Sequence, residues 1–326
     1  MPVELNRARQ EIGRIAGYPE REVLAARLED LLGEPVMIVC RQRNVYASTF
    51  PSEVVTCRLA DGSERRLFCK YTAGRSHQDH GHRGDVAYEA RVYREVLRGL
   101  SLPLPIYHGA LDSETEGTWL VLEFLEDALR VSKVPQPGMS LAAAWAGTFH
   151  TLNEARTRWK ELLFLKTYNA AYYAGWSRRT LAKAQAVRPL PRWLPNVCRR
   201  YEERIPLLCE GCQTVVHGEF TPHNVLWQNG RVVPIDWESA AVGAGEIDLA
   251  VLLEGWDESA CRVCEDSYRT ARWSGEVDVS FEERLGVARL YMVFRWLADC
   301  SDWTVARRPP TYLEELRRLG QNLGLI

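Results

Sequence analysis

The chain has 326 residues, which is more than one ordinary domain needs and about enough for two lobes that share a cleft. Hydrophobic residues make up 46% of the chain and charged residues 26%, as is typical of a globular protein in water. The formal net charge is only −2, so there is no strong field to attract nucleic acid or an anionic membrane, and we expect neither as a partner.

The first residues, Met1–Arg7, lack the basic stretch and the apolar run of a secretory signal. No segment approaches the roughly 18 continuous apolar residues of a membrane-spanning helix. We therefore expect a cytoplasmic protein whose nine cysteines are reduced, partly buried thiols. Two CxxC pairs, Cys209–Cys212 and Cys261–Cys264, leave a four-thiolate zinc site as the alternative, although the pairs lie far apart in the sequence.

The N-terminal part predicts two short helices, an antiparallel meander of three strands, one main helix and two further strands. The turn signal Asp61-Gly62 separates two strands of the meander, and Asp85 is expected to cap the main helix. The predicted helices are Leu5–Ala16, Pro19–Leu32 and Asp85–Leu100, and the predicted strands are Val36–Cys40, Glu53–Leu59, Arg66–Tyr71, Ile106–Leu111 and Thr118–Phe124.

The composition turns helical beyond residue 125, and we place the boundary between an N-terminal lobe, 1–125, and a C-terminal lobe, 126–326, at that point. The predicted fold class is α+β: an antiparallel sheet with one main helix, then a larger, mostly helical lobe that a short β segment interrupts at Thr214–Ile235. The predicted helices of this lobe are Ser140–Asn153, Arg158–Gly175, Ser177–Ala186, Leu194–Glu210, Ile247–Leu253, Ser259–Arg272, Phe281–Asp299 and Tyr312–Leu323.

Asn229-Gly230, with apolar runs on both sides, is the strongest short-range signal for a β-hairpin. A two-residue turn fixes the register of the hairpin, so that Leu226 faces Val233 and Asn224 falls opposite Ile235. We therefore expect Asn224 and the next residue, Asp236, to emerge side by side at the open end. An amide carbonyl and a carboxylate placed in this way are hard oxygen ligands, which suit Mg²⁺ bound together with substrate phosphates.

Glu219 lies just upstream, on the loop that enters this hairpin. Its carboxylate could accept a proton from an attacking hydroxyl, or position that hydroxyl. Phosphoryl transfer needs mainly positioning, charge neutralisation by a metal and one residue that orients the nucleophile, and this segment supplies candidates for each. The alternative is that Glu219 and Asp236 are ordinary turn acids, but the convergence of polar groups at the ends of apolar strands favours catalysis.

The segment His217-Gly-Glu-Phe-Thr-Pro-His-Asn224, followed by Ile235-Asp-Trp-Glu238, resembles the catalytic region of the aminoglycoside phosphotransferase and choline kinase superfamily, which has a protein-kinase-like fold. The element Gly245-Glu-Ile-Asp248-Leu-Ala also matches that superfamily. The resemblance covers nearly the whole chain. It implies a bilobal enzyme that transfers a phosphoryl group from ATP or GTP, with Mg²⁺, to a hydroxyl group of a small molecule such as an antibiotic, a sugar or an amino alcohol.

The same resemblance assigns roles to individual residues. Glu219 would be the catalytic residue, and His217 would support the backbone of the catalytic loop. Asn224 and Asp236 would hold Mg²⁺, and the acid at Asp248 would brace the catalytic loop from below.

Glu219 is also the one departure from the family pattern, which has Asp at this place. Glutamate is a competent acid–base residue that is one methylene longer, and the loop could set it back to compensate. The alternative is a nucleotide-binding pseudokinase that acts as a scaffold or sensor. Because both metal ligands are intact, we favour an active enzyme. A protein kinase is disfavoured because Trp237-Glu238 follows Asp236 in place of Phe-Gly, and no Gly-rich loop is present.

Phosphoryl transfer in a kinase-like site also needs a lysine on the nucleotide phosphates and an acid that holds it. Lys70 is the single charge in an apolar strand and shares a face with Phe68, which we expect to be a core aromatic. Glu89 falls between Val86 and Tyr93 on the apolar stripe of its helix. Since burying either charge alone is costly, we predict an ion pair, the alternative being a snorkelling lysine and an edge glutamate.

The resemblance places the phosphate-covering loop at Asn44–Pro51. No GxGxxG occurs there, so Ser48 and Thr49 would donate the hydrogen bonds. The hinge that grips the nucleotide base falls at Glu123–Leu125, where the backbone groups of Glu123 and Leu125 would make the contacts.

Three further clusters have two interpretations each. The first, His77, His80 and His82, indicates either a transition-metal site or a solvated loop. The aromatic group Tyr168, Tyr172, Tyr173 and Trp176 indicates core packing, with one or two members expected to line the acceptor pocket. The acids of 254–266 could attract a cationic acceptor or form a solvated helical face. The identity of the acceptor stays open at this point, as does the choice between ATP and GTP as the phosphoryl donor.

Overall fold

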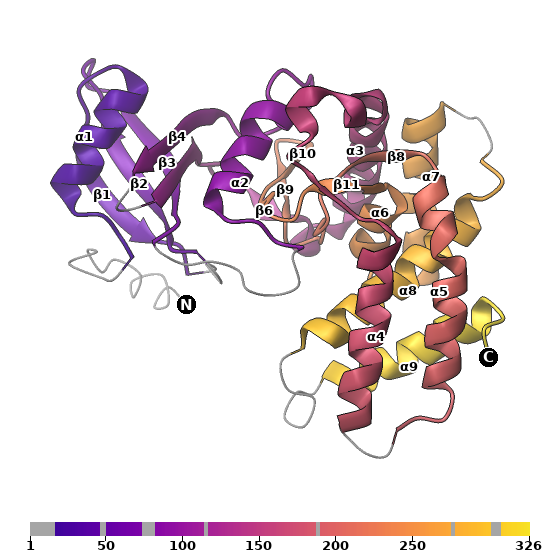
Figure 1. Cartoon of the computed structure of the whole chain (residues 1–326). Coiled ribbons are helices and arrows are strands. Elements are labelled where there is room, and N and C mark those ends of the chain that lie inside the picture. Colours follow the sequence, from indigo (N-terminus) through magenta and orange to yellow (C-terminus); the bar gives the residue numbers. More distant parts are fainter. Residues whose placement is uncertain are drawn as a thin grey trace, which may run out of the picture. The chain divides into compact units, whose positions relative to one another are not determined.

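The structure, a computed structural model, describes residues 17–45, 50–73, 82–113, 117–186, 190–274, 278–300 and 308–326. The chain divides into two compact units, which Figure 1 shows in sequence colours. The first unit comprises Met1–Ala128 together with the short segment Ile235–Ser239, and the second comprises Leu129–Pro234 and Ala240–Ile326. No helix within these described ranges is both long and apolar enough to cross a membrane.

The first unit is built on a five-stranded antiparallel sheet with the strand order β1-β2-β3-β5-β4, so the predicted meander is confirmed. Asp85 caps the main helix as expected, because its side chain accepts a hydrogen bond from the N–H of Tyr88. The predicted helix Leu5–Ala16 lies outside the described residues. The elements are α1 (Arg21–Leu32), β1 (Met37–Arg43), β2 (Ser52–Arg58), β3 (Glu64–Tyr71), α2 (Val86–Arg91) with a π-helical continuation (Val92–Leu97), β4 (Tyr107–Ser113) and β5 (Gly117–Glu123).

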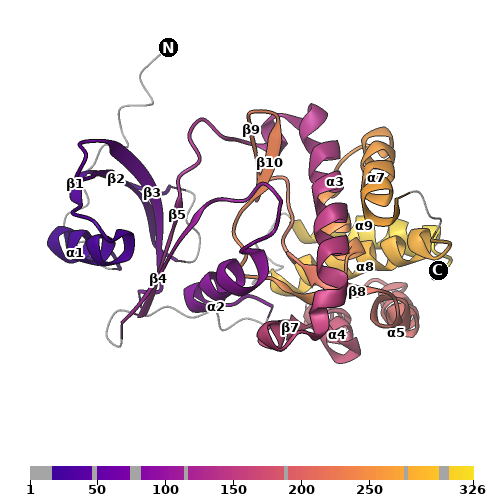
Figure 2. The ribbon, with the colours of Figure 1, turned by 90° about the horizontal axis from the view of Figure 1, so that it is seen from above.

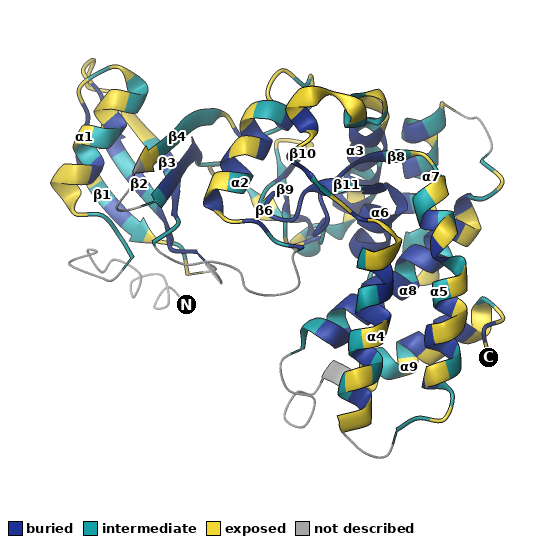
Figure 3. Ribbon diagram, in the orientation of Figure 1, coloured by how far each residue is buried: buried dark blue, intermediate teal, exposed yellow. Residues whose placement is uncertain are grey.

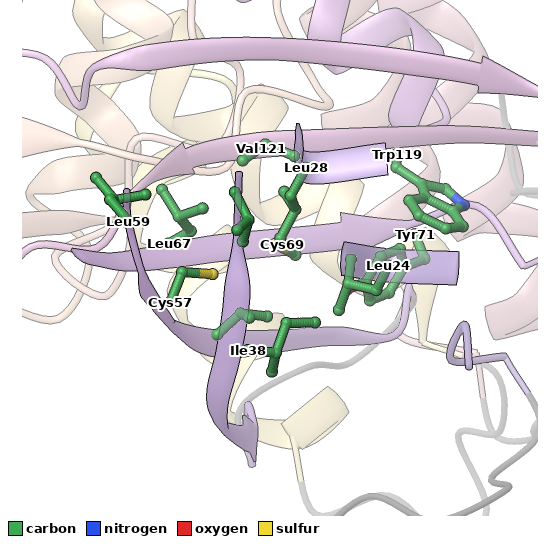
Figure 4. Close-up of a cluster of buried hydrophobic side chains, with 12 residues drawn as sticks. Leu24, Leu28, Ile38, Cys57, Leu59, Leu67, Cys69, Tyr71, Trp119 and Val121 are labelled. Carbon is green, nitrogen blue, oxygen red and sulfur yellow. The ribbon is translucent and has the colours of Figure 1, made fainter. Parts of the chain in front are cut away.

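The helices α1 and α2 lie on opposite faces of this sheet (Figure 2). Leu24 and Leu28 of α1 pack into a buried cluster whose β3 members are Leu67, Cys69 and Tyr71 (Figure 4). Because side chains alternate along a strand, the residues between these three point to the other face, where α2 lies.

That alternation corrects one detail of the sequence-based picture. Phe68, on the face of Lys70, is only half-buried, and the core aromatic of β3 is Tyr71 on the opposite face. The hydrophobic core of the unit therefore forms under α1, while Lys70 is buried on the α2 side.

The second unit is mostly helical, and α8 is its central helix. α8 packs against α4, α5, α6 and α9, and most of its length is buried (Figure 3). The predicted bounds of α5 and α8 are confirmed. The helices are α3 (Pro135–Glu154), α4 (Ala170–Ala186), α5 (Leu194–Glu210), α6 (Glu246–Leu252), α7 (Glu258–Trp273), α8 (Phe281–Asp299) and α9 (Arg308–Asn322).

The predicted hairpin is also present, and its register is as expected, with Leu226 opposite Val233. It pairs with β6 in one three-stranded sheet, and a second three-stranded sheet has the order β7-β11-β8. The strands are β6 (Leu129–Arg130), β7 (Lys166–Thr167), β8 (Gln213–Val216), β9 (Val225–Gln228), β10 (Arg231–Pro234) and β11 (Ala241–Ala244).

The prediction of one helix over Arg158–Gly175 is wrong. The segment forms short 3₁₀ turns and then β7, and only its last residues belong to α4, which continues through the predicted break at Trp176. The reason is tertiary: β7 pairs in parallel with β11, a strand that the sequence analysis did not anticipate. A contact so distant in the sequence leaves no periodicity in the local segment.

Candidate active site

Lys70 of β3 lies within ion-pair distance of three carboxylates, all in the first unit. Its Nζ is 2.7 Å from Glu89 Oε2, 2.8 Å from Asp236 Oδ1 and 3.1 Å from Glu238 Oε2. The predicted ion pair of Lys70 with Glu89 is therefore present, and two acids from the segment Ile235–Ser239 join it. The four side chains come from β3, α2 and this segment, so distant parts of the chain supply one charged cluster.

This cluster is short of positive charge. Three carboxylates face the Lys70 ammonium and the Arg83 guanidinium, whose Nε lies 3.7 Å from Glu238, and of the three acids only Asp236 has a substantially exposed side chain, at 38%. Burial, together with the Asp236 and Glu238 carboxylates, raises the pKa of Glu89 to about 7, although Lys70 opposes the shift. The ligand oxygens of the three acids lie within 4.8 Å of one another, a spacing that suits a divalent cation.

Backbone hydrogen bonds fix the segment that carries Asp236 and Glu238. The N–H of Trp237 donates to Glu89 Oε1 (3.1 Å), and the N–H of Gly84 donates to the carbonyl of Glu238 (2.6 Å). Asp236 itself has a left-handed backbone with φ of 67°, which a residue other than glycine rarely adopts. Such conformations persist where the surrounding structure over-determines them, and they cluster at functional sites.

Glu238 was not assigned to the site from the sequence. The signal that could have found it is its place two residues after Asp236, as a second acid in an otherwise apolar stretch. Among the residues that the structure describes, Glu89, Asp236 and Glu238 are the only metal-competent group of three or more. The four cysteines of the CxxC pairs are free thiols and form no such group.

In the second unit, Asp248 of α6 holds the loop that begins at His217. Its carboxylate accepts hydrogen bonds from the N–H groups of His217 (2.7 Å) and Gly218 (2.8 Å), and it lies 3.1 Å from His150 Nε2. All of these groups are buried. Two backbone donors and an imidazole thus fix the carboxylate, and the carboxylate fixes the loop.

His150 of α3 links this arrangement to a third helix. Because the Asp248 carboxylate can only accept, we assign the proton of His150 to Nε2, so that Nδ1 accepts from the Tyr268 hydroxyl (2.9 Å) of α7. Burial lowers the pKa of His150, which favours this neutral form. Neither His150 nor Tyr268 was identified from the sequence, because each is one polar residue on an otherwise buried helical face.

Glu219 is almost fully buried, and Arg295 of α8 contacts it directly. Arg295 Nη2 donates to Glu219 Oε1, and Arg295 Nη1 donates to the carbonyl of Gly218 (2.6 Å). The N–H of Glu219 donates to His217 Nδ1 (3.3 Å), and Asn224 Nδ2 donates to the Glu219 carbonyl (3.1 Å). Since the amide nitrogen of Asn224 is used within the loop, its carbonyl oxygen is the end that can coordinate a metal.

Other residues predicted for the site are placed as follows. The N–H of Glu123, at the end of β5, donates to the Ile106 carbonyl (2.9 Å), and the Glu123 carboxylate accepts from the Ile106 N–H (3.0 Å). Leu125, two residues further on, is half-buried. Their contacts with a nucleotide stay a prediction, as does the meeting of Asn224 with Asp236. Ser48, Thr49, His77 and His80 lie outside the described residues, and His82 is buried.

The acidic stretch after α6 serves local structure. Glu254 accepts from Trp296 Nε1 (3.0 Å), Asp257 caps α7 through the N–H of Ser259, and Glu265 pairs with Arg289. These bonds occupy acids that were considered for attracting a cationic acceptor.

The aromatic group of α4 and the residues before it packs as a core, as the sequence indicates. Tyr168, Tyr173 and Trp176 are buried. Tyr172 is half-buried, and its ring stacks on Tyr168 at a centroid distance of 4.1 Å.

Comparisons with known proteins bear on the fold and the family of the chain. The chain matches no curated protein sequence. Among solved structures, a choline/ethanolamine kinase family protein from Mesorhizobium loti is 14% identical, with a TM-score of 0.60 over 93% of this chain and 96% of that one. Choline kinase from Cryptosporidium parvum is 12% identical, with a TM-score of 0.64 and coverage of 94% and 98%. Wild-type aminoglycoside 2′-phosphotransferase-IIIa is also 12% identical, with a TM-score of 0.61 and coverage of 93% and 98%.

These identities are low, so the similarity shows the fold alone. It confirms the expected kinase-like class, with an antiparallel N-terminal sheet and a helical C-terminal region. The sequence model of one family, described as the phosphotransferase enzyme family, matches residues 56–285, which is more than half of the chain. The chain therefore belongs to the phosphotransferase enzyme family.

Proposed function

We propose that this phosphotransferase transfers the γ-phosphoryl group of ATP or GTP to a hydroxyl group of a small molecule. The observation that carries the proposal is the cluster of Lys70 with Glu89, Asp236 and Glu238. A nucleoside triphosphate bound with Mg²⁺ complements this cluster, because the ammonium can bind phosphate oxygens while the acids supply ligands for the metal. Similar structures that contain GDP and AMP also support a nucleotide site.

The donor set fits Mg²⁺. Asp236 and Glu238 would provide carboxylate oxygens. Asn224 would add the amide oxygen that its hydrogen bond within the loop leaves for coordination. When bound, Mg²⁺ would neutralise phosphate charge. Glu89 holds Lys70 toward the phosphates, while Ser48 and Thr49 would cover the phosphates and the backbone of Glu123 and Leu125 would contact the base.

Glu219 would orient the acceptor hydroxyl and take its proton. His217 and Asp248 contribute by fixing the loop backbone rather than by moving protons. In the balanced reaction, the hydroxyl oxygen of the acceptor forms a bond to the γ-phosphorus. The bond between the γ-phosphorus and the oxygen that bridges it to the β-phosphate breaks. A phosphate monoester, a nucleoside diphosphate and one proton result. We expect this reaction to occur in the cytoplasm.

The acceptor set to test contains amino alcohols, sugars, aminoglycosides and macrolides. Similar structures include choline kinases and phosphotransferases that act on aminoglycosides and macrolides, which supports this choice. Consumption of ATP or GTP with Mg²⁺ is measured for the wild-type protein with each acceptor and with water alone. We expect one acceptor class to stimulate consumption at least about 10-fold.

Asp236→Ala is the matched site variant for this screen. It should abolish nucleotide consumption while the far-ultraviolet circular dichroism spectrum stays that of the wild type. Undiminished consumption in folded Asp236→Ala would reject the assigned site.

A further inference from the structure

Arg295 lies in the C-terminal part of the central helix α8 and contacts the loop that carries Glu219. It is only 1% exposed, and both terminal nitrogens of its guanidinium are used on that loop. Nη1 donates to the carbonyl of Gly218, and Nη2 donates to the carboxylate of Glu219. The two acceptors belong to consecutive residues, although Arg295 itself is 76 residues away in the sequence from Glu219.

Three tyrosine side chains are neighbours of the guanidinium. Tyr172 and Tyr291 share a hydrogen bond between their hydroxyls (2.9 Å), and the Tyr291, Tyr172 and Tyr168 side chains all interact electrostatically with Arg295. Burial opposes the charge, but Tyr291 and Glu219 outweigh it and raise the pKa of Arg295 above its ordinary value. Arg295 is thus a fixed cation that does not exchange protons at the site.

The hydrogen bonds of Arg295 set the position of the Glu219 side chain. A guanidinium is a rigid planar fork, so two acceptors on its two terminal nitrogens are held at a fixed separation. The Glu219 carboxylate is therefore drawn back toward the peptide that precedes it. Gly218 is fixed on its other side as well, because its N–H donates to Asp248 and its backbone has a left-handed φ of 80°.

The third nitrogen of the Arg295 guanidinium, Nε, is a donor with no hydrogen-bond partner among the described residues, which a purely stabilising role would not explain. Nε is buried, and leaving a buried donor unpaired is destabilising. Local costs of this kind are concentrated at functional sites.

We propose that Arg295 is the positioning residue of Glu219, and that the couple, rather than the carboxylate alone, sets the place of the acceptor hydroxyl. The inference rests on the proposed function. During transfer, the acceptor O–H gives its proton to the Glu219 carboxylate as the oxygen–phosphorus bond forms and the bond to the nucleoside diphosphate breaks. Arg295 keeps its own protons throughout. An aspartate at position 219, shorter by one carbon–carbon bond of about 1.5 Å, would lose the reach to Arg295.

The first test compares Arg295→Lys and Arg295→Met with the wild type in Mg²⁺·ATP consumption, using the best acceptor of the screen or water if none stimulates. We expect kcat per folded molecule to fall about 10- to 100-fold, because a misplacement near 1 Å costs rates of this order. KM for Mg²⁺·ATP should change less than about 3-fold, since the cluster of Lys70 is not touched. A wild-type kcat in folded Arg295→Lys would overturn the proposal.

Arg284→Met is the matched control for loss of a buried arginine. Arg284 lies on the same helix and is also buried, but it pairs with Glu246 and Asp278 rather than with the catalytic loop. We expect its melting temperature to fall while kcat per folded molecule stays within about 2-fold of the wild type. If Arg284→Met lowers kcat as much as the Arg295 variants do, the loss reflects general damage to α8 and the positioning role is rejected.

The second test uses Glu219. In the Glu219→Gln background, adding Arg295→Met should cost little further kcat, because two residues that act as a unit are not additive. Fully additive losses would show that Arg295 acts on something else. Glu219→Asp should lose kcat by about the same factor as Arg295→Lys, and wild-type activity in Glu219→Asp would also overturn the proposal. If Arg295→Met does not fold, Glu219→Asp and Arg295→Lys still test the proposal.

Failure of the two proposals gives different results. If the wild type consumes nucleotide and the Arg295 variants keep its kcat, only the positioning role fails. If the wild type binds Mg²⁺·ATP but consumes none with any acceptor or with water, the proposed function fails and the positioning role falls with it. That second outcome would favour a nucleotide-binding scaffold.

Discussion

At the residue scale, the site depends on charged side chains that are buried and paired, such as Lys70 with Glu89. The sequence predicts this ion pair because Lys70 and Glu89 are each a charge on an apolar stripe, and a misplaced charge needs a partner. Lys70 also meets Glu238, 168 residues away, and Glu219 meets Arg295. Those pairings could not be predicted, because an acid in a loop and an arginine in a long helix are ordinary residues until the fold brings them together.

Lys70→Met tests the electrostatic role of the lysine. Removing the ammonium leaves the buried carboxylate of Glu89 without its cation and leaves Glu238 with Arg83 at 3.7 Å, which should cost about 3–5 kcal/mol of unfolding free energy. Binding of Mg²⁺·ATP should be lost as well. Mg²⁺ alone should recover part of the stability, because the oxygen ligands remain. The measurement is urea denaturation with and without Mg²⁺.

Arg58→Met is the control for removing a cation from the same sheet. Arg58 pairs with Glu64 at an exposed position, so its loss should cost no more than about 1 kcal/mol. The interpretation fails if Lys70→Met and Arg58→Met destabilise the protein equally.

At the scale of elements, α3 and α7 approach each other closely at Gly147. A Cβ on Gly147 of α3 would lie 2.6 Å from the Tyr268 carbonyl and 3.1 Å from the Arg272 backbone nitrogen. Only glycine permits this contact, because backbone atoms cannot rotate away as a side chain can. The contact matters to the site, since Tyr268 binds His150 and His150 binds Asp248.

Gly147→Ala should therefore destabilise the protein by about 1–3 kcal/mol, the usual cost of overpacking, or by more if the helices cannot separate. The matched control is Gly175→Ala in α4, where an added Cβ meets nothing within 4 Å. That substitution should stabilise the protein by about 0.4–1 kcal/mol, because alanine has less freedom in the unfolded chain. Thermal unfolding of both variants measures the two changes in stability. If Gly147→Ala and Gly175→Ala both stabilise or both destabilise the protein, the packing argument is contradicted.

The start of α8 carries a pH-sensitive contact. Hydrogen bonding to Arg284 is the main cause that lowers the pKa of Asp278 to about 2, with Ser280 assisting. A carboxyl group whose pKa is lowered by folding contributes stability above its unfolded pKa of about 4, and loses it as the pH falls through the folded value. The stability difference between the wild type and Asp278→Asn should thus be largest above pH 4 and shrink toward pH 2. A difference that does not change over this range would contradict the assignment.

At the scale of the whole molecule, the order of sheet and helices was predictable, whereas the small sheets of the second unit were only partly so. The Asn229-Gly230 turn fixed the hairpin register because its rule is local. The periodic stretches of α5 and α8 gave their bounds for the same reason. The segment before α4 was misread because β7 depends on β11, a partner that no local pattern reveals.

The chain passes from the first unit to the second, returns to the first for one short segment, and then enters the second again. The segment Ile235–Ser239 belongs to the first unit, although the second unit supplies the chain on both sides of it. It carries Asp236 and Glu238 to Lys70. The position of this segment explains why Asp236 and Glu238 follow the hairpin of the second unit yet complete the charged cluster of the first.

The most direct test of the account is to identify the phosphorylated product. The wild-type protein is incubated with Mg²⁺, ATP or GTP and the acceptor that most stimulates nucleotide consumption, and the products are followed by ³¹P nuclear magnetic resonance. We predict a phosphate monoester of the acceptor in a one-to-one ratio with nucleoside diphosphate, and none with Asp236→Ala. Nucleotide consumption that yields only inorganic phosphate with every acceptor, or an ester formed equally well by Asp236→Ala, would contradict the account.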